Sequence, residues 1–365
     1  MGFSGLCQQE HYPKFSWDKV PVAFHFGKRK GGLLTKKEAK FVTSKSNFIV
    51  LEKGHGTPEY NYTEEAIEEE AKQLKKMNSD MKVIFYWNSF LDYKMYRAHH
   101  IYQEHPEWWL RKKNGELDFK NVSLKRYDLS NPQVRNWWTN VAMSTIVGKS
   151  IDGIFMDAFI QVTAPSNKKL WGDKKYQAVQ QGLKDLIKET REKIGNDKLI
   201  LYNGIRSTPD RNIGNNYSKY TDAVMIEHFG IIKSTSKESM LTDIKEMEKA
   251  GKSGKIVVFK AWPGFAWINK EFMAKPLRKK QAISKKNITF PLAAFLAGAQ
   301  EHSYIIYNWG YEINMGCLEW YKEFDKPLGK PLDEMRIKGW ELSRNYEHAS
   351  VWVNLETKEA KIDWK

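Results

Sequence analysis

Two carboxylates, each at the end of a short apolar segment, are the residues of this chain best suited to catalysis. Asp157 closes the segment Asp152–Asp157, which opens on an Asp-Gly turn, and Glu227 follows the apolar segment Ala223–Ile226. In a parallel barrel the carboxyl ends of the strands form the floor of the active site, so acids at these positions indicate chemistry. Two alternatives stay open: Asp157 caps the helix that follows it, or Glu227 is a structural partner of His228 or a lysine.

A pair of carboxylates that flanks an oxocarbenium-like transition state is the usual equipment for glycoside cleavage. One acid protonates the leaving oxygen, and the other attacks the sugar or activates water. We predict that Asp157 is the nucleophile and that Glu227 is the acid/base, because the apolar residues beside Glu227 would desolvate its carboxyl group. Glu52 ranks third, as a substrate-binding residue or an ion-pair partner. Asp152 precedes its strand and is excluded, since it should lie at the opposite face.

Polar or aromatic residues stand at or just beyond the end of every predicted strand. A shared polar pocket explains these residues better than unrelated helix caps at each strand end would. Lys260 could form a Schiff base, but the aromatic loop Trp262–Trp267 that follows suits stacking on sugar faces, which favours a role for Lys260 in binding an anionic group. The expected substrate-binding residues are His25, Glu52, His55, Trp87, Asn88, Asn203, His228, Lys260, Trp262, Asn308 and Trp309.

The elements that must position these residues follow from short apolar runs that alternate with stretches of helical period. The predicted strands are Val22–Phe26, Phe48–Leu51, Val83–Trp87, Gly153–Met156, Leu199–Tyr202, Ala223–Ile226, Ile256–Phe259 and Tyr304–Tyr307. The predicted helices are Lys36–Val42, Glu64–Met77, Pro132–Val147, Lys174–Ile194, Asn216–Tyr220, Ser239–Lys249 and Phe290–Ala299. This alternation predicts an α/β fold, a (β/α)8 TIM barrel. An open doubly wound sheet is the competitor, but no G-x-G-x-x-G follows the first strand.

The chain is predicted to form one large domain with two small additions. Residues 1–18 are an N-terminal tail, residues 19–340 the catalytic barrel, and residues 341–365 a β-hairpin packed on the barrel, with strands at Ser350–Asn354 and Ala360–Trp364. The long insertion Asn88–Asn131 follows the third strand. Long loops at the carboxyl face of a barrel usually shape access of the substrate.

The composition narrows the kinds of molecule that this protein could bind. The 365 residues carry a net charge of +15, with 14 Trp and 17 Tyr, which favours an anionic partner and an aromatic-lined groove. The lysines are spread over many segments and form no nucleic-acid-binding motif, so nucleic acid is not expected. A sulfated or uronic polysaccharide suits the charge and the aromatic residues together. Lysines on solvated faces are the alternative interpretation.

Several classes of site and location are excluded or narrowed by the sequence. Only Cys7 and Cys317 occur, so a disulfide framework or thiolate cluster is excluded, and no metal-ligand motif or cofactor signature is present. No apolar run is long enough to span a membrane. The start of the chain up to Cys7 indicates the remnant of a trimmed signal peptide, which favours a secreted or periplasmic protein. Cys7 is either a lipid anchor or part of a flexible tail, and the oligomeric state does not follow from the sequence.

The segment Asp152–Asp157 resembles the Asp-Gly-hydrophobic-Asp motif of retaining glycoside hydrolases on a (β/α)8 barrel, whose nucleophile ends strand four. The segment Pro327–Pro331, which leads into Ser350–Asn354, resembles the tail of bacterial glycosidases. The basic charge and the aromatic content are similar to those of marine bacterial enzymes that cut sulfated algal polysaccharides, including endo-fucanases. The resemblance implies an endo-acting, retaining hydrolase of sulfated fucan or sulfated galactan.

The chain departs from the pattern of those families at the acid/base. In related families the acid/base residue ends strand five or six. Here strand five ends in Asn203, which is not an acid, so Glu227 on strand six is the remaining candidate for the acid/base. Two rival classes remain: a non-catalytic glycan-binding barrel, and a basic nucleic-acid-binding protein.

Overall fold

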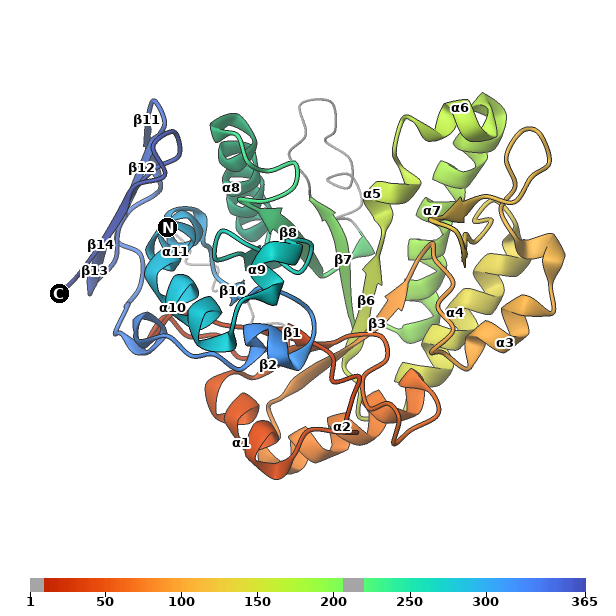
Figure 1. The fold of residues 1–365 in the computed structure, drawn as a ribbon, viewed down its shortest axis with the longest axis horizontal. Coiled ribbons are helices and arrows are strands. Elements are labelled where there is room, and N and C mark those ends of the chain that lie inside the picture. The colour runs from red at the N-terminus through yellow and green to blue at the C-terminus, as the bar shows by residue number, and fades with distance from the viewer. Residues whose placement is uncertain (1–9, 206–219) are drawn as a thin grey trace, which may run out of the picture.

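A parallel sheet that closes on itself forms the centre of the protein. The computed structural model describes residues 10–205 and 220–365. Within these ranges the strands pair in the order β1-β2-β3-β6-β7-β8-β9-β10, and Val22 pairs with Ile305 to close the ring between β1 and β10. The fold is therefore a (β/α)8 TIM barrel, which confirms the predicted fold class (Figure 1). The strands are β1 (Phe24–Phe26), β2 (Phe48–Leu51), β3 (Lys82–Asn88), β6 (Gly153–Asp157), β7 (Leu199–Ile205), β8 (Ala223–Phe229), β9 (Ile256–Ala261) and β10 (Ser303–Tyr307).

The barrel strands are apolar because both of their faces are covered. All four residues of β2 are buried, as expected for a parallel strand with side chains toward the barrel interior on one face and toward helices on the other. Successive side chains alternate between these two faces. This alternation decides which residues near each strand end can reach the pocket.

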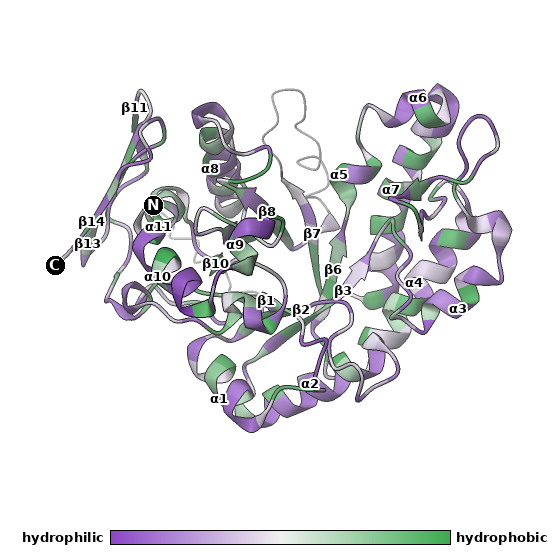
Figure 2. Ribbon diagram, in the orientation of Figure 1, coloured by the Kyte–Doolittle hydropathy of each residue, from purple (hydrophilic) through white to green (hydrophobic). Residues whose placement is uncertain are grey.

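Amphipathic helices cover the outside of the barrel, and Figure 2 shows hydrophilic and hydrophobic residues alternating along them. A capping box between Thr35 and Glu38 starts the helix α1, and Asn131 with Pro132 starts the helix α4. Of the predicted helix Asn216–Tyr220, only Tyr220 belongs to the described residues. The long helices are α1 (Lys36–Lys45), α2 (Thr63–Met77), α4 (Pro132–Ile146), α7 (Asp173–Ile194), α8 (Lys237–Lys252), α10 (Leu277–Asn287) and α11 (Thr289–Gly298).

Short elements fill the connections at the carboxyl ends of the strands. The insertion after β3 contains α3 (Ala98–Gln103), the 3-10 turn η1 (Pro106–Trp108), β4 (Phe119–Lys120) and β5 (Leu124–Lys125). Two short helices follow β6 and one follows β9: α5 (Phe159–Val162), α6 (Asn167–Trp171) and α9 (Lys270–Ala274). A π-helical turn, η3 (Ile313–Cys317), and a 3-10 turn, η4 (Lys322–Asp325), follow β10.

The C-terminal segment forms a separate antiparallel sheet beside the barrel, at the left of Figure 1. Its strands are β11 (Arg336–Lys338), β12 (Glu341–Asn345), β13 (Ala349–Asn354) and β14 (Ala360–Trp364), paired in that order. The expected hairpin corresponds to β13 and β14, and a second hairpin precedes it. The buried Tyr346 fixes the sheet to α11, because its hydroxyl donates to the Leu296 carbonyl at 2.6 Å. No helix in the described ranges is long and apolar enough to cross a membrane.

Candidate active site

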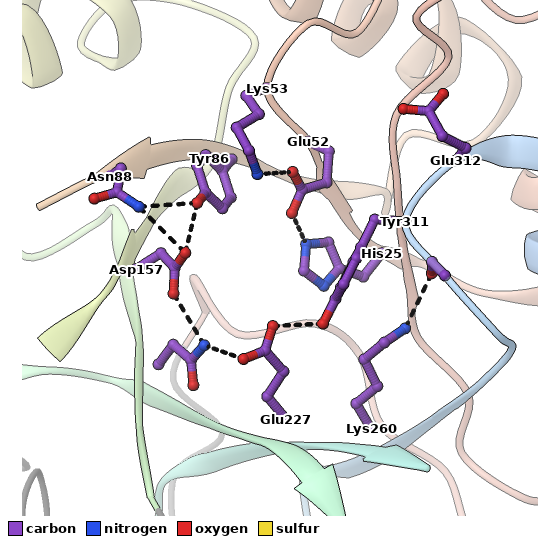
Figure 3. Close-up of polar contacts among 12 residues, drawn as sticks. His25, Glu52, Lys53, Tyr86, Asn88, Asp157, Glu227, Lys260, Tyr311 and Glu312 are labelled. Atoms are coloured by element: carbon purple, nitrogen blue, oxygen red, sulfur yellow. Dashed lines mark hydrogen bonds and ion pairs between the residues drawn. The ribbon is translucent and has the colours of Figure 1, made fainter. Parts of the chain in front are cut away.

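Asp157 is the last residue of β6, and its carboxylate accepts four hydrogen bonds, of which Figure 3 draws those from side chains. Oδ2 accepts hydrogen bonds from the Tyr86 hydroxyl at 2.5 Å and from Asn88 Nδ2 at 3.2 Å. Oδ1 accepts from Asn203 Nδ2 at 2.9 Å and from the Ala158 amide at 2.7 Å. Both oxygens are thus held in place, and hydrogen bonds of this kind stabilise the charged form.

The backbone beside Asp157 is in an unusual conformation. Ala158 has φ 78° and ψ 13°, in the left-handed region that residues with a Cβ rarely adopt. Ala158 is the N-cap of α5, and that helix has no side-chain cap, so Asp157 does not cap it. The capping alternative for Asp157 is therefore wrong, and the strain beside this carboxylate is of the kind that clusters at functional sites.

Glu227 lies within β8 and also points toward the pocket (Figure 3). Its Oε1 accepts a hydrogen bond from the Tyr311 hydroxyl at 2.5 Å, and its Oε2 accepts one from Asn203 Nδ2 at 2.7 Å. His228 Nδ1 lies 3.3 Å from Oε2. The pairing register between β8 and β9 shifts after Ile226, and Trp262 on the neighbouring loop donates to the Glu227 carbonyl at 2.9 Å.

A single amide group bridges the two acids. Asn203 Nδ2 lies 2.9 Å from Asp157 Oδ1 and 2.7 Å from Glu227 Oε2. Because the two distances together bound the third side of the triangle, these oxygens are at most about 5.6 Å apart. The two hydrogens of an amide nitrogen point in different directions, so each can serve one carboxylate.

The two acids line one pocket of about 400 Å³. Among residues 10–205 and 220–365, the other charged side chains of the lining are those of Arg29, Lys53, Lys120 and Glu312. The wall is completed mainly by aromatic and polar residues from several loops. These are Tyr86, Tyr93, Gln161, Asn203, His228, Trp267 and Tyr311. A pocket of this volume with polar and aromatic lining lies within the size range of small-molecule binding sites.

Burial and neighbouring charges set the titration of the site. Burial raises the pKa of Asp157, and the Glu227 carboxylate raises it further, against the Tyr86 hydrogen bond and the Lys53 charge. Burial acts to lower the pKa of Lys53, but its ion pair with Glu52 at 2.6 Å prevails and raises it. Burial acts to raise the pKa of Glu52, yet Lys53 and His25 hold it well below its ordinary value. Glu52 is therefore a fixed anion under the pocket.

The structure brings four of the sequence-predicted residues together in the pocket lining: Asp157, Glu227, Asn203 and His228. A second set lies beneath this lining and contacts it from below. His25 hydrogen-bonds to Glu52 at 2.9 Å, and the Lys260 amine donates to Asn308 Oδ1 at 2.7 Å. This set consists of His25, Glu52, Asn88, Lys260, Trp262 and Asn308, none of which is more than 5% exposed.

Lys260 is enclosed rather than open to a substrate. Its amine lies 4.4 Å from the centre of the Trp262 ring and 4.6 Å from that of Tyr311, and burial lowers the pKa of Lys260 to about 8. Because Lys260 does not line the pocket, the structure offers no place for a Schiff base or for direct anion binding by this residue. It supports Tyr311 and Trp262, both of which hydrogen-bond to Glu227.

Three residues expected to bind substrate are instead packed away from the pocket, so the expectation was wrong for His55, Trp87 and Trp309. His55 is buried and hydrogen-bonded to Glu70 Oε2 at 3.0 Å. Trp87 stacks on Trp138 at 5.8 Å, on the helix side of β3. Trp309 is fully buried, and its ring fills the space above Gly316, where an added Cβ would lie 2.3 Å away.

Several pocket residues were missed by the sequence analysis. Tyr86 could have been found, because alternation along β3 sends Tyr86 inward together with Asn88 and sends Trp87 outward. Lys53 directly follows Glu52 and carried the same strand-end signal. Tyr311 and Glu312 come from the loop after β10, which shows no periodicity. The described residues contain no group of three or more His, Cys, Asp or Glu side chains that could hold a metal ion.

Comparisons with known proteins agree with this architecture. Residues 75–350 match the family described as hypothetical glycosyl hydrolase family 15. A search of curated proteins finds no match. Among solved structures, a noncanonic maltogenic α-amylase from Thermotoga neapolitana is similar, with 11% identity, a TM-score of 0.50, and coverage of 91% of this chain and 84% of that chain.

Two further solved structures show the same fold similarity. An α-amylase from Geobacillus thermoleovorans, complexed with acarbose, has 14% identity and a TM-score of 0.50, over 94% of this chain and 88% of that chain. A GH36 α-galactosidase from Geobacillus stearothermophilus has 12% identity and a TM-score of 0.50, over 92% of this chain and 47% of that chain. At these identities the similarity concerns the fold alone.

Proposed function

Because the chain belongs to hypothetical glycosyl hydrolase family 15, it is a glycoside hydrolase, and we propose that it cleaves by a retaining mechanism with Asp157 as nucleophile and Glu227 as acid/base. The observation that carries this proposal is the Asn203 bridge. Retaining enzymes hold their two carboxyl groups about 5 to 5.5 Å apart, whereas inverting enzymes leave roughly 6.5 to 9.5 Å for a water molecule. The bound of about 5.6 Å between Asp157 and Glu227 oxygens supports the first class.

In the first step, an Asp157 oxygen attacks the anomeric carbon of the sugar. The bond from this carbon to the glycosidic oxygen breaks, and Glu227 transfers its proton to that leaving oxygen. The donors around Asp157 favour its charged form, against burial and the Glu227 carboxylate, and they fix the orientation of the carboxylate in the pocket. Repulsion between two neighbouring carboxylates favours the state in which the pair retains one proton, as this step requires.

In the second step, the Glu227 carboxylate takes a proton from water. The water oxygen bonds to the anomeric carbon, and the bond from this carbon to Asp157 breaks, which restores both acids. Tyr311 and Asn203 hold the Glu227 oxygens in one orientation through both steps. Tyr86, Asn88 and the Ala158 amide hold Asp157 in the same way.

For the substrate we propose an anionic, sulfated polysaccharide, a sulfated fucan or a sulfated galactan, cut within the chain by a secreted or periplasmic enzyme. The net charge of +15 supports an anionic partner. A basic surface attracts polyanions, and this attraction acts over distances up to about the Debye length. Trp267, Tyr93 and Tyr311 in the pocket wall supply faces for sugar stacking.

The proposal is tested by Asp157→Asn on a panel of sulfated fucans, carrageenans, agars and uronans. We expect turnover to fall by roughly three orders of magnitude or more, as for loss of a covalent nucleophile, while glycan binding persists. The control is Asp173→Asn on α7, whose side chain is 81% exposed. Turnover of Asp157→Asn near that of the control would remove Asp157 from the mechanism.

The stereochemistry of the product gives an independent test. Proton NMR of the fresh reducing end, recorded before mutarotation, should show the anomeric configuration of the substrate. An inverted first product would mean that one of the two acids activates water and that Asp157 forms no covalent intermediate.

A further inference from the structure

Among the residues that the structure describes, three cationic side chains line the pocket, and two of them form ion pairs with carboxylates of the protein. Arg29 forms an ion pair with Glu312 at 2.7 Å and donates from Nε to the Lys53 carbonyl at 3.0 Å. Lys53 forms an ion pair with the buried Glu52 at 2.6 Å. These two charges are compensated within the protein before any substrate arrives.

Lys120 differs from both of them. It ends β4, where it pairs with Leu124 of β5, so the insertion after β3 carries it to the pocket. The side chain is half-buried. Within residues 10–205 and 220–365, no carboxylate lies at ion-pair distance from its amine, and no acceptor is hydrogen-bonded to it. Burial lowers the pKa of Lys120, and the Asp157 carboxylate acts against this from across the pocket.

A half-buried ammonium group loses part of its hydration free energy, and without an anionic partner no ion pair compensates for this loss. Sugar hydroxyls are neutral acceptors, and the pocket already offers neutral groups for them, such as Asn203 and Gln161. A sulfate or a carboxylate would instead form a charge-assisted hydrogen bond with the amine, which is about twice as strong as a neutral one.

We propose that Lys120 determines specificity by binding an anionic substituent, a sulfate ester or a uronate carboxylate, on a sugar unit held beside Asp157. The inference rests on the proposed function for the identity of the ligand as a glycan. It goes further in assigning the charge recognition to one side chain within the pocket, rather than to the basic surface as a whole.

An alternative role for Lys120 is purely electrostatic: its charge would stabilise the Asp157 carboxylate whatever the substrate. The two roles differ in what they predict. An effect on Asp157 changes the turnover of every substrate alike, whereas recognition of an anionic group changes only the binding of glycans that carry one.

The experiment is calorimetric binding in an Asp157→Asn background, so that the glycan is bound without being cut. Lys120→Met is compared with Lys113→Met, which removes an exposed charge from the same insertion. The probes are a sulfated fucan, a carrageenan and a polyuronate, each beside its desulfated or carboxyl-reduced counterpart. The sulfated and uronate arms distinguish the two sources of negative charge.

For the anionic probe that binds, Lys120→Met should weaken affinity by about ten- to a hundredfold, as for one hydrogen bond between charged groups. Lys113→Met should leave it nearly unchanged, and neither variant should alter binding of the neutral counterpart. Lys120→Arg keeps the charge and should keep most of the affinity, which guards against a folding defect in the Met variant. An equal loss on charged and neutral probes, no loss, or no binding of any anionic probe would overturn the inference.

Failure of the proposed function gives a different pattern. If Lys120 governs binding of an anionic glycan but the unmodified protein cuts no glycan, the hydrolytic role fails and the inference stands. If the unmodified protein cuts only neutral glycans and Lys120→Met cuts them as fast, the hydrolytic role stands and the inference is overturned.

Discussion

Replacement of Asn203 by alanine is the sharpest test of the paired-acid site, because its amide is the donor shared by Asp157 at 2.9 Å and Glu227 at 2.7 Å. One substitution therefore removes a hydrogen bond from each acid. A hydrogen bond to a charged group contributes about 1.5 to 3 kcal/mol. The pocket is open to water, which replaces part of each bond, so the lower figure applies. Asp157 is charged and Glu227 is protonated in the first step, so the two bonds contribute about 1.5 and about 1 kcal/mol, and the combined loss of about 2.5 kcal/mol corresponds to roughly seventyfold in kcat/KM.

The same substitution should also change the pH dependence. Burial and the Glu227 carboxylate already raise the pKa of Asp157, and loss of a donor to its carboxylate raises it further. The nucleophile must be deprotonated to attack. The acid limb of the kcat/KM profile should therefore move to higher pH, and Asn203→Ala should lose more activity in mildly acidic buffer than at neutral pH.

The assay is the initial rate of release of reducing ends across a pH series. Asn140→Ala makes the same chemical change away from the pocket, at an exposed position of α4 whose amide oxygen accepts a hydrogen bond from Lys193. Melting temperatures of both variants report on folding. If Asn203→Ala matches the Asn140→Ala control in rate, or if its acid limb does not move, the amide does not couple the two acids and the reasoning fails.

Three further predictions concern the support of the site and the packing of the barrel. Tyr311→Phe removes the hydroxyl that donates to Glu227 at 2.5 Å. Loss of this hydrogen bond should lower kcat, measured at steady state, about ten- to a hundredfold. An unchanged kcat would contradict the role of this contact. Glu52→Gln should destabilise the protein most at neutral pH. Ion pairs hold the folded pKa of Glu52 below its unfolded value of about 4.3, so its stabilisation is present above that value and is lost as the pH falls through the folded pKa. Urea unfolding at neutral and acidic pH checks this, and a pH-independent difference from the unmodified protein would refute it. Gly182→Ala would place a Cβ on α7 only 1.9 Å from the carbonyl oxygen of Leu129, in the turn before α4. Thermal unfolding should therefore show a loss of stability of about 1 to 3 kcal/mol, and unaltered stability would mean that this contact relaxes freely.

The positions of the barrel strands were predictable because both faces of a parallel strand are buried. The run Phe48–Leu51 matches β2 residue for residue. Strands β7 and β8 extend beyond their apolar runs to include Asn203 and Glu227, and these polar extensions are site residues. The helix α10 was missed because its sequence is basic and only Ser284 in it is buried, which leaves no apolar face to detect.

From the sequence, only those site residues were predictable whose positions follow from the direction of the strands. The placement of Asp157 and Asn203 follows from parallel strands that end at one rim of the barrel. The choice of Trp87 failed because Asn88 and its predecessor lie on opposite faces of β3, so the inward neighbour is Tyr86. Lys120 reaches the pocket through a hairpin within a long insertion, whose path depends on tertiary contacts that no local pattern encodes.

The pairing of Val22 with Ile305 has a consequence for how the chain is made. The first strand cannot complete its hydrogen bonds until roughly 280 further residues have left the ribosome, which takes about 15 to 60 s at ordinary synthesis rates. During that interval β1 presents an open edge, and such edges invite pairing with other chains. Contacts so distant in sequence also form slowly once the chain is complete. The nascent protein should therefore depend on chaperones until β10 is released, and overexpression should yield aggregates that begin from the amino-terminal half.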